Sequence, residues 1–301
     1  MTEFNKNNIL RGPTPPRIKE KCYDLCREYL GGVWLNVTVG DIEVKRLTGG
    51  ATNQLYYCAF NEDKRLSAGD VPQEHEWFEL NDQKNPILVQ ELAHKLAGIH
   101  TTVVPIKKTQ NWIFDHFEDS YNKAYKMFDI NALIDECNCE TLKTHDLKEE
   151  IQWIKDLITE SDSPVTFTHI DFRGHNIMVT ESDGLVICDF EYGCYGCRGF
   201  DFGSLFVGWG RNCHQHLRYV KFPDDNTIRP FIDSYIKEST KILGIRFTND
   251  IRNTFQHILK ETKVFTLVTT MFLVLYLLNV NELTNNNRPF DKKKMMVCIN
   301  Q

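Results

Sequence analysis

Three polar residues between positions 171 and 189 have the types and the spacing that phosphoryl transfer requires. Asn176 stands five residues after Asp171, and Asp189 stands thirteen residues after Asn176. Amide and carboxylate oxygens are ligands that Mg²⁺ prefers, and a second carboxylate can accept the proton of an attacking hydroxyl. We therefore predict that Asn176 and Asp189 hold Mg²⁺ and that Asp171 acts as the general base.

A β-hairpin must bring the two metal ligands together. The segments Ile177–Thr180 and Leu185–Cys188 are short and mostly apolar, and the sequence Ser182-Asp183-Gly184 between them is typical of a turn. Because a hairpin folds the chain back on itself, it would place Asp189 beside Asn176. Asp171, at the start of the same stretch, would stay available for the reacting hydroxyl.

The spacing of this block matches a known pattern. The sequence His-x-Asp-x-x-x-x-Asn, followed by a hairpin and then Asp-Phe, has the catalytic-loop and metal-loop spacing of kinases. In such loops the histidine braces the backbone, so we expect a structural role for His169. A surface hairpin with incidental carboxylates is the alternative interpretation.

Longer segments resemble one family in particular. Asp189-Phe-Glu-Tyr192, followed by Arg198-Gly-Phe-Asp-Phe-Gly203, resembles the signature of the choline/ethanolamine kinases. Leu47-Thr-Gly-Gly-Ala-Thr-Asn53 resembles the phosphate loop of that family, and residues 92–100 resemble its first C-lobe helix. The resemblance implies ATP-dependent phosphorylation of choline and/or ethanolamine, the first step of phospholipid head-group synthesis.

The resemblance also implies the cofactors and the residues that bind them. ATP and Mg²⁺ are the expected cofactors, and the loop near residues 48–53 would lie over the ATP phosphates through its backbone N–H groups. The cofactor-binding residues in this loop are Gly49, Gly50, Thr52 and Asn53.

We expect a binding site for a cationic amino alcohol to contain aromatic side chains, because ring faces attract diffuse positive charge. The family takes part of its cage from two tryptophans on a late helix, where this chain has Leu273 and Tyr276. Such a change could favour ethanolamine over choline. The candidate substrate-binding residues are Tyr192, Tyr195, Trp209 and Tyr276, each of which could instead be ordinary packing.

The resemblance and the order of elements predict an α+β, protein-kinase-like fold with two lobes. Helical spacing over residues 18–30 and extended segments at 41–47 and 54–60 precede a mainly helical remainder. We divide the chain into an N-terminal arm with a shortened N-lobe at 1–85 and a helical C-lobe at 86–301. Asn85 and Pro86 are typical of the first residues of a helix.

The N-lobe is expected to be incomplete. Only 46 residues separate Asn53 from His100, whereas the rest of a kinase N-lobe needs roughly 60 residues. The catalytic loop also departs from the family, because Ile170 and His175 replace an asparagine and a glycine, and Gly208 stands where a glutamate is usual. These departures leave open a catalytically impaired regulatory or binding subunit, or a kinase of another small hydroxyl compound. A homodimer or heterodimer would suit the first of these alternatives.

Composition and charge exclude other classes of function. The 301 residues include 42% hydrophobic residues, enough for a real core, and carry a formal net charge of −6. An acidic balance disfavours a dedicated nucleic-acid binder, so we expect no nucleic-acid partner. Ten cysteines without framework spacing and an N-terminal sequence without an apolar stretch predict a cytoplasmic protein.

Two segments have alternative interpretations. Val264–Val280 is uncharged but contains three threonines and only 17 residues, fewer than the roughly 20 of a spanning helix. We therefore expect a helix buried in the helical lobe and no stable membrane insertion. Cys194, Cys197, Cys213 and His216 approximate a zinc-ribbon spacing, but zinc would not explain the acidic, arginine and glycine residues around them.

Overall fold

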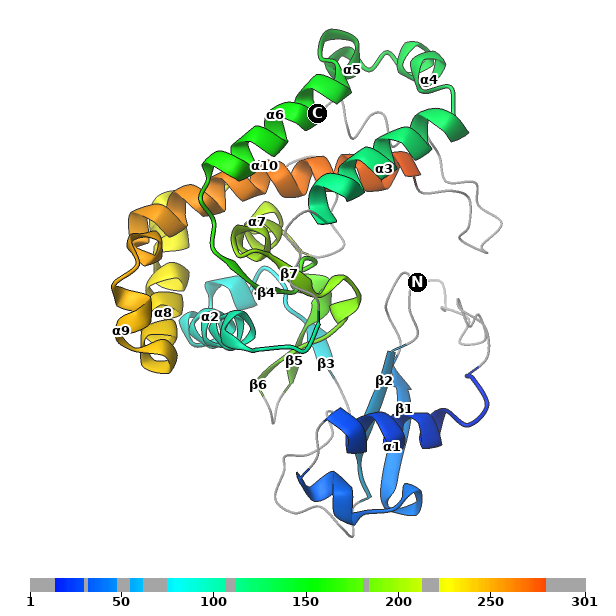
Figure 1. The fold of residues 1–301 in the computed structure, drawn as a ribbon, viewed down its shortest axis with the longest axis vertical. Helices are drawn as coiled ribbons and strands as arrows, with labels where there is room; N and C mark the ends of the chain where they lie inside the picture. The colour runs from blue at the N-terminus through cyan, green and yellow to red at the C-terminus, as the bar shows by residue number, and fades with distance from the viewer. Residues whose placement is uncertain are drawn as a thin grey trace. The chain divides into compact units, whose positions relative to one another are not determined.

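The computed structural model describes residues 14–29, 32–47, 55–61, 75–106, 112–180, 184–212 and 222–279 (Figure 1). The chain divides into two compact units, of which the first comprises residues up to Glu74 together with two short later segments, and the second comprises the rest.

The first unit contains a helix and a strand pair. Helix α1 (Ile18–Tyr29) precedes strands β1 (Ile42–Leu47) and β2 (Leu55–Phe60), which are antiparallel. Ile42 is fully buried, and the hydroxyl of Tyr23 on α1 donates to the carbonyl of Val37 at 2.8 Å. The predicted helix and both extended segments are thus confirmed. The predicted phosphate loop, with Gly49, Gly50, Thr52 and Asn53, lies outside the described residues.

The second unit is mainly helical, with short strand pairs. Its elements are β3 (His75–Trp77), α2 (Pro86–Thr101), α3 (Trp112–Met127), α4 (Ile130–Glu136), α5 (Glu140–Thr144), α6 (Leu147–Glu160), β4 (Val165–Thr168), β5 (Ile177–Thr180), β6 (Gly184–Ile187), β7 (Cys194–Cys197), α7 (Gly199–Val207), α8 (Asp225–Leu243), α9 (Ile245–Thr248) and α10 (Phe255–Asn279). Helix α2 begins as predicted, because the Asn85 side chain accepts a hydrogen bond from the Ile87 amide at 3.0 Å and Pro86 follows it.

The three-stranded sheet of the second unit includes residues that precede helix α2. Strand β3 pairs antiparallel with β5, which also pairs with β6, so the order is β3-β5-β6. Residues 75–85, which the sequence predicts to be part of the N-lobe, therefore group with the second unit. The division falls before β3 because this strand bonds to a hairpin of the second unit.

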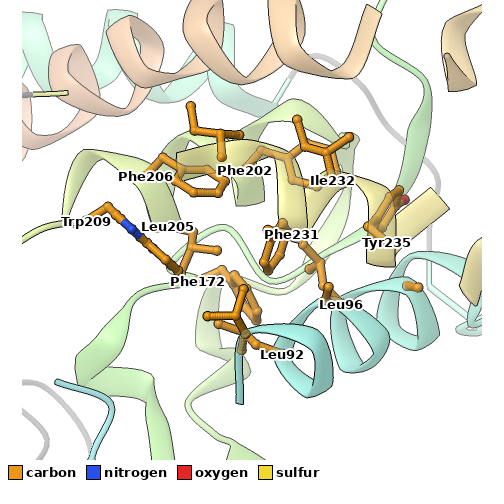
Figure 2. Close-up of a cluster of buried hydrophobic side chains, with 14 of the residues drawn as sticks. Leu92, Leu96, Phe172, Phe202, Leu205, Phe206, Trp209, Phe231, Ile232 and Tyr235 are labelled. Atoms are coloured by element: carbon orange, nitrogen blue, oxygen red, sulfur yellow. The ribbon is translucent and has the colours of Figure 1, made fainter. Parts of the chain in front are cut away.

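One apolar core of the second unit lies between α2, α7 and α8. Figure 2 shows side chains from these three helices converging, with Leu92 and Leu96 from α2 facing Phe202 and Phe206 from α7. Phe231, Ile232 and Tyr235 of α8 close the cluster, and Phe172 reaches it from the loop after β4. This core anchors the base of the loop that carries Asp171.

The second core surrounds α10, which runs along α3 and α6 (Figure 1) and packs closely on α7. Gly199 and Gly203 make the α7 contact possible, because a Cβ at Gly203 would overlap the backbone of Phe265. At the start of α7, Arg198 donates to the Glu261 carboxylate of α10 at 2.7 Å, and both side chains are buried. Burial alone would lower the pKa of the Arg198 guanidinium, but Glu261 raises it above its ordinary value.

Helix α10 has the length and apolar composition of a membrane span, and a third of its most apolar window, 33%, is buried. Phe265, Val268 and Leu275 are among its residues in the second core. The predicted helix is thus present over the described part, which ends at Asn279, and it is partly buried, not enclosed by the helical lobe.

Candidate active site

Two strand pairs bring the candidate residues together. Thr168 at the end of β4 lies opposite Cys194 at the start of β7. Ile177 at the start of β5 lies opposite Ile187 at the end of β6. The loop between β4 and β5, residues 169–176, therefore lies against the loop between β6 and β7, residues 188–193. The predicted hairpin is confirmed, although residues 181–183 of its turn lie outside the described residues.

The Asp171 carboxylate is partly exposed and is held by two neighbours. Its Oδ2 accepts a hydrogen bond from the Asn176 side-chain amide at 2.8 Å, and its Oδ1 pairs with the Arg173 guanidinium at 2.7 Å. The same Asn176 amide nitrogen also donates to the Asp171 carbonyl at 2.8 Å. These contacts fix the carboxylate at the loop surface, where a hydroxyl could approach it.

Asn176 and Asp189 are joined through the backbone. The Cys188 amide donates to the Asn176 carbonyl at 3.0 Å, which places Asp189 one residue from that contact. Asp189 itself has a left-handed conformation, with φ of 66°, at the start of a short 3-10 helix. Burial raises the pKa of the neighbouring Cys188 thiol to about 11, with Asp189 as the second cause, so this thiol stays protonated at neutral pH.

These residues could hold a magnesium ion. The side-chain nitrogen of Asn176 is committed to Asp171, which turns its amide oxygen toward other partners. Asp189 follows the residue that bonds to the Asn176 backbone, and the amide and carboxylate of these two residues would offer oxygen donors only, as Mg²⁺ prefers. Two protein ligands suffice for Mg²⁺ when waters and nucleotide phosphates supply the remainder.

His169 connects the two loops, in agreement with its predicted structural role. Its Nε2 lies 2.8 Å from the Cys188 carbonyl and its ring packs on Phe190, with centroids 4.4 Å apart. The side chain is fully buried. His169 therefore braces the backbone just before Asp189.

Sequence reasoning missed Asp201 and its partners. The buried Asp201 carboxylate accepts hydrogen bonds from the backbone amides of His169 at 2.8 Å and Ile170 at 2.6 Å. The imidazole of His100 lies 3.1 Å from the same carboxylate. Asp201 stands in the quoted Arg-Gly-Phe-Asp segment, which was the available signal, but nothing in the sequence indicated what it would contact.

Aromatic side chains gather beside the two loops. Tyr192 packs edge-on against Phe272 of α10 with centroids 6.0 Å apart, and Phe272 stacks on His116 of α3 at 4.8 Å. Burial raises the pKa of the Tyr192 hydroxyl. Nearby groups that raise it further are Glu191, Tyr276, Asp171 and Asp189. Tyr192 is thus close to the candidate catalytic residues and to Tyr276, and Phe272 is an aromatic neighbour that we did not predict.

The other two aromatic candidates are placed elsewhere. Trp209 is buried in the first core, where its ring packs on Phe206 at 5.0 Å (Figure 2). Tyr195 is buried on β7, and its hydroxyl accepts from the Val104 amide at 2.9 Å. The ring contacts of these two residues are with other neighbours, Phe167 for Tyr195 and Phe206 for Trp209.

The zinc alternative falls partly outside the described residues. Cys194 and Cys197 stand on β7, and burial raises the pKa of each thiol to about 11. Cys213 and His216 are not described. Among the residues that are described, no three His, Cys, Asp or Glu side chains are grouped so as to hold a metal ion.

Comparison with solved structures identifies the fold. The choline kinase of Cryptosporidium parvum Iowa II matches with a TM-score of 0.58 at 16% identity, covering 93% of each chain. The ethanolamine kinase of Plasmodium vivax matches with a TM-score of 0.57 at 18% identity, covering 97% of this chain and 95% of that one. The predicted α+β, protein-kinase-like fold is thus confirmed.

Sequence comparison identifies the family. The human choline/ethanolamine kinase is 26% identical over 282 residues, which cover 74% of this chain and 70% of that protein. The profile of the choline/ethanolamine kinase family matches residues 73–295. This chain belongs to the choline/ethanolamine kinase family, which is a family of phosphotransferases.

Proposed function

We propose that this protein transfers the γ-phosphoryl group of ATP to the hydroxyl group of choline or ethanolamine. One observation carries the proposal: in a chain of this family, Asp171 is oriented by Asn176, and the β5–β6 hairpin brings Asp189 beside Asn176. A base and two metal ligands are the parts that phosphoryl transfer needs from this lobe.

In the proposed reaction Asp171 orients the substrate hydroxyl and accepts its proton as the oxygen attacks phosphorus. Asn176 keeps one carboxylate oxygen in place, while Arg173, whose side chain is 49% exposed, can move off the other. Asn176 and Asp189 would hold Mg²⁺, which when bound would supply positive charge to neutralise the charge that develops on the phosphoryl oxygens. The loop at residues 48–53 stays our proposed site for the ATP phosphates.

The aromatic cluster suits the other end of the substrate. Ring faces attract an ammonium group, more strongly where water is partly excluded. Tyr192 and Phe272 are half-buried, and Tyr276 is 39% exposed. We propose that these three rings bind the ammonium, with Phe272 providing an aromatic face next to Leu273, which stands where the family has a tryptophan.

A second function has one observation in its favour. Within the described part of the first unit, β1 and β2 form a two-stranded sheet, and positioning ATP needs more than a strand pair. A regulatory subunit that binds substrate without turnover fits that observation. Measuring ADP release distinguishes such a regulatory subunit from an active enzyme.

The deciding experiment measures ADP release by the full chain with choline and with ethanolamine in parallel. We expect Mg²⁺-dependent release with at least one substrate. Asp171→Asn should lower kcat by about 1,000-fold, because a positioned base contributes roughly 10²–10⁴-fold. The matched control is Asp156→Asn on the exposed face of α6, which should leave kcat unchanged. Substrate binding without ADP release from the wild type would favour the regulatory subunit and contradict the enzyme.

A further inference from the structure

Arg173 is the positively charged partner of the proposed base. Its Nε lies 2.7 Å from Asp171 Oδ1, and its side chain is 49% exposed, against 26% for Asp171. An ion pair at an exposed position contributes little to stability, because water competes for both charges. Exchanging Asp171 for another anion therefore costs the Arg173 side chain little free energy.

The backbone of Arg173 is held in place although its side chain is exposed. The Asn176 amide donates to the Arg173 carbonyl at 2.8 Å, across the short 3-10 turn Gly174–Asn176. Asn176 is buried and binds the Asp171 carboxylate through its own side chain. The Cα atom of Arg173 therefore stays beside the base, while the guanidinium, at the end of a long side chain, can turn to another partner.

The surroundings of the base carry several negative charges. Burial raises the pKa of the Tyr192 hydroxyl, and the carboxylates of Glu191, Asp171 and Asp189 raise it further, so these three carboxylates lie around one place. The phosphates of ATP would bring more negative charge to the same place. A cation besides the metal ion would offset that charge, and Arg173 is the arginine of this loop.

A guanidinium has the geometry for this task. It carries five N–H donors in a planar fork that matches pairs of phosphate oxygens. During phosphoryl transfer, negative charge spreads over the three equatorial oxygens, and an arginine directed at them is a recurring catalytic part. The contact between Arg173 Nε and Asp171 shows that the fork already lies next to the carboxylate that would accept the substrate proton.

We propose that Arg173 is a catalytic residue, which exchanges Asp171 for the γ-phosphoryl group of ATP when the amino alcohol binds. The substrate hydroxyl takes the place of the guanidinium on Asp171. The hydroxyl oxygen then bonds to the γ-phosphorus as its proton passes to Asp171. The bond from the γ-phosphorus to the β–γ bridging oxygen breaks, and its electron pair leaves with ADP. Arg173 stabilises the charge on the phosphoryl oxygens, and this inference rests on the proposed function.

The kinetic test compares Arg173→Gln and Arg173→Lys with the wild type. Arg173→Gln should lower kcat by about 100-fold, because removing one donor to a transition-state oxyanion costs roughly 10²–10³-fold. Lysine keeps the charge but lacks the planar fork, so Arg173→Lys should recover part of that loss. The matched control is Arg246→Gln on the exposed surface of α9, which should leave kcat unchanged.

A binding measurement tests the same contact without turnover. Calorimetry with Mg²⁺ and saturating choline, and in parallel with saturating ethanolamine, gives the Kd of β,γ-imido-ATP, which is not transferred. The same titration with ADP omits the γ-phosphoryl group. In Arg173→Gln the Kd of the ATP analogue should rise about 10-fold, as expected for loss of a hydrogen bond to a charged group. The Kd of ADP should stay unchanged.

The outcomes distinguish this inference from the proposed function. If Arg173 only covers the base, Arg173→Gln should raise kcat and leave the preference for the ATP analogue over ADP unchanged, which would overturn the inference in an active enzyme. Equal losses of affinity for the analogue and for ADP would also overturn it. A preference for the analogue that depends on Arg173, in a chain that releases no ADP, would support the inference and contradict the proposed turnover. A wild type without that preference would overturn the inference whether or not it releases ADP.

Discussion

The two units of this chain differ in how much apolar surface their described residues bury. The second unit contains two extensive cores around α7, one with α2 and α8 and one with α10. In the first unit, the buried apolar side chains among the described residues are Tyr23 and Ile42. Asp171, Asn176 and Asp189 all belong to the second unit. The chemistry we propose thus depends on the part of the chain with the larger cores.

This difference indicates which of the two units can hold residues in costly backbone conformations. Large cores can impose costly local conformations, such as the left-handed Ile170 and Asp189, because many contacts hold the surrounding backbone. A strand pair with little burial cannot do the same. We therefore expect changes in the second unit to have the largest effects on both activity and stability.

The largest effect should follow removal of a metal ligand from the second unit. Asp189→Ala should lower ADP release by about 1,000-fold, because a bound metal ion contributes several kcal/mol to the transition state. The measurement is the Mg²⁺ dependence of nucleotide binding and of ADP release. Asp156→Asn is again the matched control. Unchanged Mg²⁺-dependent nucleotide binding in Asp189→Ala would show that the metal is held elsewhere.

The next effect concerns the contact between α7 and α10. Gly203→Ala should lower the free energy of unfolding by about 3 kcal/mol, because the added Cβ meets the backbone of Phe265 and cannot displace it easily. Gly98→Ala in α2 is the matched control, since a Cβ there meets nothing within 4 Å. That control should stabilise by about 0.5–1 kcal/mol. Denaturant unfolding measures both, and equal changes in the two variants would contradict the close approach of the helices.

A smaller effect is expected in the first unit. Ile42→Ala removes a fully buried side chain and should destabilise the β1–β2 pair by about 2 kcal/mol, at the lower end for such truncations because few buried neighbours surround it. Amide exchange in β2 should accelerate while exchange in β5 stays unchanged. Equal acceleration in both strands would show that the two units unfold together, which would contradict the expected difference in their stability.

The smallest effect is a dependence of stability on pH in the second unit. Burial lowers the pKa of the His100 imidazole, against the opposing effect of Asp201. Below about pH 6.5 the unfolded chain therefore binds a proton that the folded chain does not. Stability should be full above that pH and should fall by about 1 kcal/mol as pH drops to roughly 5.5.

The His100→Gln variant isolates this contribution. It should show a weaker loss of stability between pH 7.5 and 5.5 than the wild type, measured by urea unfolding at each pH. Burial also lowers the pKa of His116, which therefore contributes a loss of the same sign in both proteins. Identical pH profiles would mean that His100 does not titrate differently on folding.

Local sequence patterns predicted the hairpin and the residues beside it. Asn176 and Asp189 are separated by two short strands and a turn, so their proximity follows from local geometry. The capped start of α2 at Asn85 was predictable for the same reason. Each of these correct predictions depends on residues that lie within about one helical turn or one hairpin of each other.

Contacts over long sequence separations could not be predicted in this way. Asp201 meets residues 31 and 32 positions before it, and His100 is 101 positions away. Composition also cannot distinguish an aromatic ring that packs in a core from one beside a site, which is why Trp209 was proposed to bind substrate. Leu273 stands where the family has a tryptophan, and its position in the sequence could not show that the neighbouring Phe272 would face Tyr192 in the folded helix.

The pairing of β3 with β5 has a consequence for the order of folding. The β5–β6 hairpin joins residues as close as Thr180 and Gly184, whereas β3 pairs Trp77 with Met178, about a hundred positions later. Closing the longer loop costs more chain entropy, and distant pairings form late. We therefore expect the hairpin that carries Asn176 and Asp189 to form first. Strand β3 would join afterwards, so during synthesis it stays unpaired until the chain has emerged as far as Ile187, about a hundred residues later.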